Sequence, residues 1–156
     1  MVKYICSLLV VDDIEKSRFL YENILEQKVK SDYGENITFE GDFAIHKKAH
    51  FRSLIGEKKM IKGSHHFELY FETENIELIY KKILDNRLEI LHSVQEQPWK
   101  QKVFRFYDYD SNMIEIGEKL EYTAYRLWKE NYSIEDIIRY TYLQEDEISE
   151  ALKKYS

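Results

Sequence analysis

The chain has 156 residues, which is enough for one ordinary domain or two very small ones. A formal net charge of −6, with 44% hydrophobic and 33% charged residues, indicates a soluble globular protein and argues against nucleic acid or anionic membranes as partners. Cys6 is the only cysteine, which excludes an internal disulfide and suits a reducing compartment. No secretory signal pattern and no membrane-spanning apolar run are visible, so a cytoplasmic location is expected.

The sequence pattern of residues 4–48 predicts one strand, one helix and three further short strands. Residues Tyr4 to Val11 (YICSLLVV) form an apolar strand pattern. Asp12 and Asp13 then provide a helix cap, and the helical pattern continues to about Leu25. Three short strands are expected at residues 29–33, 36–40 and 43–48. Residues 49–63 are basic and irregular, with a short helix expected around residues 51–55.

The same order of elements then repeats. Residues 66–73 predict a strand, 74–86 a helix and 88–94 a strand, followed by a hairpin at residues 98–118. The segments LLVVDDIE (8–15) and YFETENIE (70–77) align at an offset of 62. The chain is therefore predicted to contain two βαβββ modules, with boundaries at about 1–62 and 64–118.

Alternation along the first strand of the second module separates two faces. Glu68 shares one face with His66, Tyr70 and Glu72. The opposite face carries three apolar residues and is expected to point into the core: Phe67, Leu69 and Phe71.

The hairpin contains an acidic residue in an unusual position. Its second strand puts Ile114 and Ile116 on one face and Glu115 on the other. A charged carboxylate in a packed layer is costly unless it is paired. Glu115 therefore either faces water or has a partner.

The sequence RFYDYDSNMIEIGE (105–118) resembles the last hairpin of the vicinal-oxygen-chelate superfamily, which includes glyoxalase I, bleomycin-resistance proteins, fosfomycin-resistance enzymes and extradiol dioxygenases. The usual turn there is Asp-Pro-Asp-Gly, whereas this chain has Tyr109 for the proline and Ser111 for the glycine. The resemblance covers residues 3–118. It implies an α+β fold in which two βαβββ modules form a curved mixed sheet around a cleft, with helices outside.

The resemblance also implies candidate metal ligands. In metal-dependent members the glutamate at the position of Glu115 is a ligand, and the first strand of each module supplies another. The offset of 62 makes Cys6 the counterpart of Glu68, and a fourth position falls near Ile45 or His46. One divalent ion (zinc, nickel, manganese or iron) could be held by Cys6, His46, Glu68 and Glu115.

Such a site would suit a lyase or isomerase in which Glu115 also moves a proton. An extradiol dioxygenase is least expected, because positions 6 and 68 are not histidine.

The sequence is also compatible with a second hypothesis, in which the site holds no metal ion. Arg105, on the neighbouring strand, could pair with Glu115 or Glu68 and satisfy them without any ion. The protein would then bind or sequester a cationic or polyhydroxylated small molecule without catalysis. The residues expected to line that cleft are Tyr70, Trp99, Arg105 and Tyr107. Trp99 could instead simply pack over the hairpin. The resemblance and the many aromatic residues also predict a homodimer.

Residues 119–156 lie outside the resemblance and predict three helices, at about 119–131, 134–142 and 146–155. Ser133 with Asp136 forms a pattern similar to a capping box. The last two helices are similar to helix-turn-helix units, but residues 120–156 contain five Lys or Arg against eight Asp or Glu. That balance argues against DNA binding. The helices are expected to pack on one another, on the sheet or on a second subunit.

Overall fold

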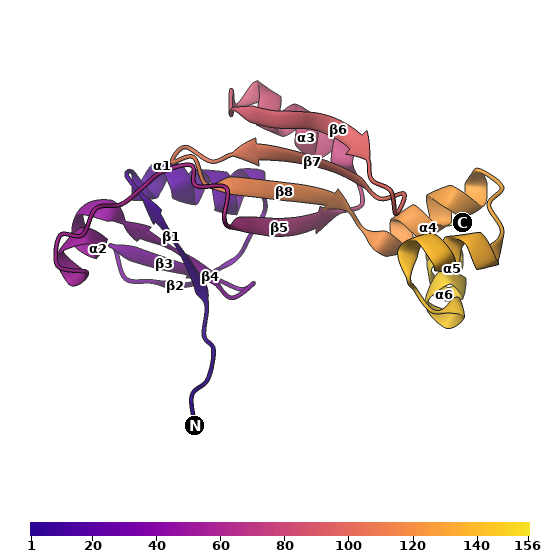
Figure 1. Cartoon of the computed structure of the whole chain (residues 1–156), viewed down its shortest axis with the longest axis horizontal. Helices are drawn as coiled ribbons and strands as arrows, with labels where there is room; N and C mark the ends of the chain where they lie inside the picture. The colour runs from indigo at the N-terminus through magenta and orange to yellow at the C-terminus, as the bar shows by residue number, and fades with distance from the viewer.

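The computed structural model describes residues 1–156 as three consecutive parts (Figure 1). The first part contains β1 (Ser7–Val11), α1 (Ile14–Arg18), η1 (Phe19–Ile24), β2 (Val29–Asp32), β3 (Asn36–Phe39), β4 (Phe43–Lys47) and α2 (Lys48–Leu54). The second contains β5 (Glu68–Thr73), α3 (Ile76–Asp85), β6 (Ile90–Glu96), β7 (Lys102–Tyr107) and β8 (Met113–Glu118). The third contains α4 (Leu120–Lys129), α5 (Ile134–Thr141) and α6 (Glu145–Tyr155). No helix is both long and apolar enough to cross a bilayer.

The two βαβββ units have the same sheet topology. Their strand orders are β1-β4-β3-β2 and β5-β8-β7-β6, each a mixed four-stranded sheet. In each sheet the first and last strands of the unit run parallel, and the remaining pairs are antiparallel. The predicted α+β class and its repeated plan are therefore confirmed, with one four-stranded sheet per unit.

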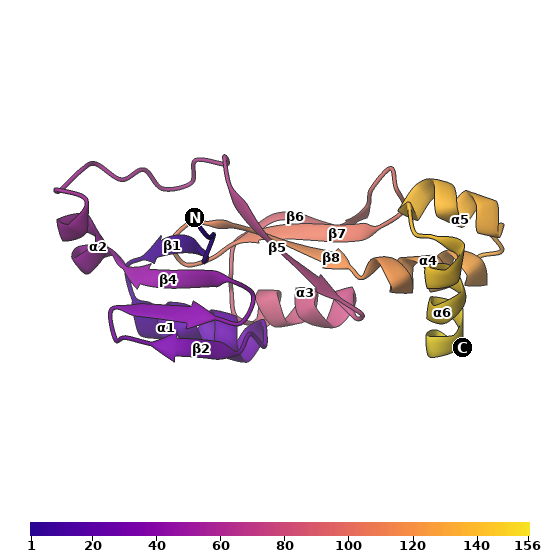
Figure 2. The same cartoon turned by 90° about the horizontal axis from the view of Figure 1, so that it is seen from below.

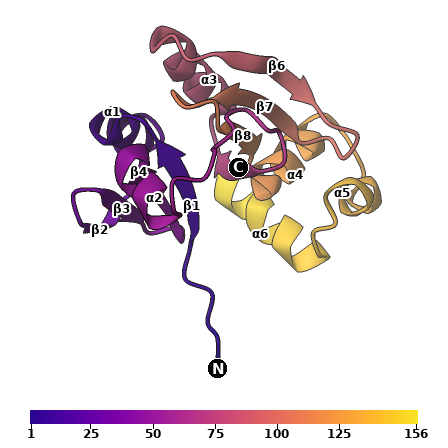
Figure 3. The same ribbon diagram turned by 60° about the vertical axis from the view of Figure 1, so that its left-hand side comes forward.

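Three local expectations differ from the structure. β1 begins at Ser7 rather than Tyr4, because Ser7 pairs with Phe43, the first residue of β4. The residues before it extend away from the body of the protein (Figures 1 and 3). Phe67 was expected in the core but is 48% exposed, since it precedes β5.

The predicted helix ending near Leu25 is also wound differently. It is an α-helix only to Arg18 and continues as the π-helix η1, in which the Leu25 amide donates to the Leu20 carbonyl at 3.0 Å. Leu20, Tyr21, Ile24 and Leu25 are all buried, so the apolar face predicted for this helix does face the core.

One hydrophobic core of 18 buried residues spans both units. The helices α1, η1 and α3 cover the apolar faces of the sheets, and α3 contacts η1 directly. Phe43 of the first sheet meets Phe71 of the second edge to face, with ring centroids 5.6 Å apart. Such aromatic contacts add about 0.5–1.5 kcal/mol beyond the apolar area that they bury.

The turn between β7 and β8 connects the two units through its carboxylates. Asp108 is 5% exposed and accepts hydrogen bonds from the Tyr21 hydroxyl (2.9 Å), the Asp110 amide (2.9 Å) and both nitrogens of Asn112. Asp110 is equally buried and accepts from the Asp12 amide at 3.0 Å. The acidic turn singled out in the sequence is therefore a structural joint between the units.

The C-terminal helices have a small core of their own and follow directly on the end of β8 (Figure 2). Ion pairs join them to the second unit: Arg126 pairs with Glu118 and Glu96, and Lys154 pairs with Glu74. Glu118, the last residue of β8, is 2% exposed. It accepts from the Thr123 hydroxyl at 2.7 Å and pairs with Arg126 at 3.0 Å. Arg126 also donates to the Lys100 carbonyl at 2.6 Å, so α4 is fixed both to β8 and to the β6–β7 loop.

Tyr21→Phe tests the joint between the units. The change keeps the packed ring but leaves a buried oxygen of Asp108 without its donor from the first unit. We expect a loss of about 1–2 kcal/mol in the free energy of unfolding, measured by urea titration. Tyr109→Phe is the control, since its hydroxyl makes no hydrogen bond. Equal effects of both changes would contradict the assignment.

Arg126→Met tests the attachment of the helices. It leaves the buried Glu118 carboxylate without its cation, which we expect to cost about 3 kcal/mol and to expose α4 to protease. Arg139→Met removes an exposed pair with Asp136 and should change stability by less than about 0.5 kcal/mol. Limited proteolysis followed by mass spectrometry gives the cleavage position. Uncut helices in the Arg126 variant would show that other contacts hold them.

Candidate functional site

The second sheet has one apolar face and one polar face. Ile114 and Ile116 point into the core, and Glu115 points to the opposite, polar face. Tyr70 on β5 and Arg105 on β7 are the direct neighbours of Glu115 across the sheet. His92 on β6 is in turn the neighbour of Arg105. All four strands therefore contribute one residue to a row across this face.

Arg105 is the centre of this polar face. Its Nε lies 2.9 Å from a carboxylate oxygen of Glu68, and its Nη2 forms an ion pair with Glu115. The side chain of Glu115 is only 9% exposed, compared with 32% for Glu68. Arg105 thus satisfies both carboxylates at once, and Glu115 has the partner that its position in the strand requires.

The third contact of Arg105 is with the ring of His92. The Nη1 of Arg105 lies 3.3 Å from His92 Nε2, which must accept because an arginine only donates. The other ring nitrogen, Nδ1, can then donate to the Ser93 carbonyl at 2.9 Å. The two carboxylates of Glu68 and Glu115 and the single guanidinium of Arg105 together carry a net charge of −1.

Tyr70 belongs to a second hydrogen-bonded group on the same face. Its hydroxyl accepts from Gln101 Nε2 at 2.8 Å and donates to Glu72 at 2.8 Å. Burial, followed by the neighbouring Glu72, raises the pKa of Tyr70 to about 12. The ring lies over Gly117, where a Cβ atom would come within 2.8 Å of it. Glycine at this position leaves the space that Tyr70 occupies.

The remaining predicted binding residues lie at opposite ends of the sheet. Trp99 donates to Gln101 at 2.9 Å and lines a cleft against α5, next to Tyr142. Tyr107, at the other end of β7, bonds His65 in the linker before β5. The predicted cleft residues therefore lie along the second sheet and its β6–β7 loop without meeting at one point.

The candidate ligands of the first unit lie on or beside its own sheet. Ile45 is fully buried in the core, so His46 lies on the opposite face of β4, where α2 covers it and leaves it 7% exposed. Its Nδ1 accepts a hydrogen bond from Asn36 Nδ2 at 3.1 Å, and its Nε2 shares a hydrogen bond with His50 Nδ1 of α2 at 2.8 Å. Burial, followed by the nearby charge of His50, lowers the pKa of His46. Cys6 lies before β1 and is partly exposed.

The donor set of this chain does not fit a divalent ion as the side chains are arranged. Arg105 lies between Glu68 and Glu115 and uses the oxygens that an ion would need. His46 is engaged with Asn36 and His50 on the other sheet. No three His, Cys, Asp or Glu side chains come together as a metal-binding group.

Two residues of this face were not anticipated from the sequence. Gln101 is 4% exposed and joins Trp99, Tyr70 and the Glu118 carbonyl. His92 contacts Arg105 only because β6 has irregular register on both sides of it. A glutamine beside a tryptophan could have suggested the first contact, whereas no local signal predicts the second.

The fold defines a class of protein built from two βαβββ units. A family model for the glyoxalase-like domain matches residues 4–121. The chain therefore belongs to the glyoxalase-like family, within the vicinal-oxygen-chelate (glyoxalase, bleomycin-resistance and dioxygenase) superfamily. No curated protein matches the chain.

Solved structures agree with this assignment. A protein of unknown function from Agrobacterium tumefaciens is 31% identical, with 76% of this chain and 95% of that chain covered and a TM-score of 0.68. A glyoxalase/bleomycin resistance protein/dioxygenase from Nocardioides is 18% identical, with 76% and 83% covered and a TM-score of 0.58. The fosfomycin resistance protein FosX from Listeria monocytogenes is 16% identical, with 79% and 98% covered and a TM-score of 0.56. At these identities the last two support the fold alone.

His46 should make stability depend on pH. Its folded-state pKa lies below the unfolded value of 6.5, so protonation favours the unfolded chain. The stability that neutral His46 contributes to the folded state is fully present above pH 6.5. It is lost as the pH falls towards and through the folded-state pKa. Urea titrations between pH 7.5 and 5 should show this loss, and His46→Gln should reduce it. His66→Gln, at an exposed position, is the control. An unchanged pH profile in the His46 variant would contradict the assignment.

Proposed function

We propose that this protein binds a small molecule on the polar face of the second sheet and needs no resident metal ion to do so. The observation that carries the proposal is the pairing of Arg105 with both Glu68 and Glu115. The guanidinium group provides the positive charge that a divalent ion would otherwise supply to these carboxylates. The cluster is thus stable without an ion.

The charge of the cluster supports one class of ligand. Two carboxylates and one guanidinium leave one negative charge, and Glu68 is the more accessible of the two acids. Tyr70 is 47% exposed beside it and offers an aromatic surface. A cationic or polyhydroxylated molecule would find hydrogen-bond acceptors and an aromatic contact here. Arg105 would contact the same ligand. Tyr107 and Trp99 lie at opposite ends of the sheet, so each would contact only a ligand that extends to its end.

The alternative is a metal-dependent lyase or isomerase, in which Glu115 acts as ligand and proton carrier, with zinc, nickel, manganese or iron. For this activity Arg105 would have to leave both carboxylates. The two functions therefore make opposite predictions about metal content and about the role of Arg105.

We also propose that the protein is a cytoplasmic homodimer. Its family relationship supports a dimer, as do the partly exposed aromatic residues Tyr70 and Trp99, since such residues are enriched at subunit interfaces. The single free Cys6 suits a reducing compartment.

Metal content separates the two functions. We expect protein purified without chelator or histidine tag to contain no stoichiometric metal and to gain no thermal stability from Zn²⁺, Ni²⁺, Mn²⁺ or Fe²⁺. Arg105→Ala should lose about 3 kcal/mol, because the largely buried Glu115 loses its cation. Divalent ions should restore part of that loss. Lys102→Ala on the same strand is the control and should respond to no ion.

A near-stoichiometric metal in the unmodified protein that is lost in Glu115→Gln would overturn the metal-free proposal and support the lyase or isomerase. Binding itself is tested by a thermal-shift series with polyamines and sugars on the unmodified protein and on Glu68→Gln. Thermal stabilisation that disappears in the variant supports the proposal. If neither polyamines nor sugars stabilise the unmodified protein, the ligand assignment is contradicted.

A further inference from the structure

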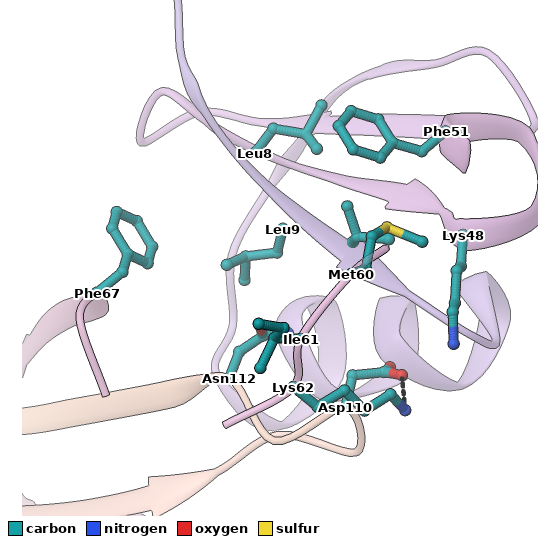
Figure 4. A pocket seen from close by; sticks show the side chains of 11 residues that line it. Leu8, Leu9, Lys48, Phe51, Met60, Ile61, Lys62, Phe67, Asp110 and Asn112 are labelled. Carbon is teal, nitrogen blue, oxygen red and sulfur yellow. Dashed lines mark hydrogen bonds and ion pairs between the residues drawn. The ribbon is translucent and has the colours of Figure 1, made fainter. Parts of the chain in front are cut away.

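A separate cavity lies between the two units, and none of its lining residues belongs to the Arg105 cluster. It has a volume of about 360 Å³, which is within the range of small-molecule sites. Its floor is the open face of β1, one wall is α2, and another wall is the β7–β8 turn. The linker before β5 passes over it (Figure 4). Neither the resemblance nor the family assigns residues of this cavity to a role in this chain.

The cavity is apolar over most of its surface. Seven of its 11 lining residues are hydrophobic. Figure 4 shows Leu8 beside Phe51 at one end, with Leu9 and Met60 between them and the polar end. Leu8 is 37% exposed although it lies on a sheet face. An apolar occupant would remove this surface from water, which is favourable by about 25 cal/mol per Å².

The polar end of the cavity is electrically balanced. Lys62 pairs with Asp110 at 3.0 Å and with Asp12 at 2.5 Å, and Lys48 pairs with Asp12 at 3.1 Å. Two cations thus face two anions, and no net charge is available to attract an ionic ligand. This arrangement favours an uncharged occupant over a carboxylate or an amine.

The cover of the cavity is weakly attached. Residues 58–66, which we call the strap, form no helix or strand and make no hydrogen bond between backbone groups. Gly56 and Gly63 flank or interrupt it with positive φ angles of 65° and 66°. Lys62 fastens the strap to both units, through Asp12 and Asp110, and His65 fastens it to Tyr107 of β7. A segment held mainly by side-chain contacts opens at low free-energy cost.

We propose that this cavity is a binding site for an uncharged, mainly apolar small molecule, and that the strap opens at Lys62 to admit it. The site goes beyond the proposed function, because it uses neither Glu68, Glu115 nor Arg105. The ligand class follows from the apolar lining and the balanced charges, and its size follows from the cavity volume.

The test uses N-phenyl-1-naphthylamine, an uncharged fluorescent probe excited above the tryptophan band, on the full chain. We expect saturable one-site binding, with at least tenfold weaker binding of the anionic probe 1-naphthoate. Leu8→Trp fills the cavity and should weaken binding of the uncharged probe at least tenfold. Leu78→Trp places the same side chain at an exposed position on α3 and should leave binding unchanged.

Further variants keep the test decisive. Met60→Trp fills the cavity from the strap, outside the core, and should weaken binding even if Leu8→Trp fails to fold. Lys62→Ala should speed probe dissociation at least fivefold in stopped-flow measurements, whereas Lys59→Ala should not. Unchanged binding in folded Leu8→Trp or Met60→Trp would overturn the site, and an unchanged rate in Lys62→Ala would overturn the opening at Lys62.

The two proposals fail independently. Glu115→Gln should bind the uncharged probe like the unmodified protein, because the cavity does not include this residue. If Glu115→Gln alone abolished probe binding, the probe would occupy the polar face, and the cavity proposal would be wrong. Metal content and the response to cations do not enter this test.

Discussion

Two buried carboxylates in the β7–β8 turn hold the two halves of this protein together. Asp108 accepts a hydrogen bond from the Tyr21 hydroxyl of the first unit. Asp110 accepts hydrogen bonds from the Asp12 amide and from the Lys62 ammonium group. A buried carboxylate without donors costs several kcal/mol, so these contacts allow few alternative positions of the units. The turn keeps its role although Tyr109 and Ser111 replace the usual proline and glycine. Its contacts with the first unit are made by the two aspartates. Ser111 adopts a positive φ of 64° in the glycine position.

The same turn sets the geometry of the polar face. It ends β7 and begins β8, so it fixes the register in which Arg105 lies opposite Glu115. A shift of one residue would turn Glu115 into the core and expose an isoleucine. The pairing of Arg105 with both acids, and the metal-free binding that we propose from it, therefore depend on a hairpin whose turn is anchored in the other unit.

The turn also connects the polar face with the cavity between the units. Asp110 lines the cavity and holds the strap through Lys62, while Asn112 of the same turn precedes β8. The C-terminal helices are attached at the other end of β8, through Glu118 and Arg126. One strand thus links the cavity, the polar face and the helical extension, each fixed by a different buried carboxylate.

The sequence by itself determined the features that depend on neighbouring residues. Period-two alternation separated Glu115 from Ile114 and Ile116, and the caps at Asp13 and Ser133 were readable because capping is local. The repeated order of elements predicted the two units, and the resemblance of residues 105–118 to the last hairpin of the superfamily predicted how they are arranged.

Only the tertiary structure decided which side chains meet between distant segments. The choice between Ile45 and His46 required the register of β4, because one residue changes the face. The irregular β6 brought His92 to Arg105, and α5 gave Trp99 different neighbours from those of Arg105. Phe67 lay outside the core because pairing with β8 begins only at Glu68. Such contacts depend on strand register and packing across long sequence separations, which local periodicity does not encode.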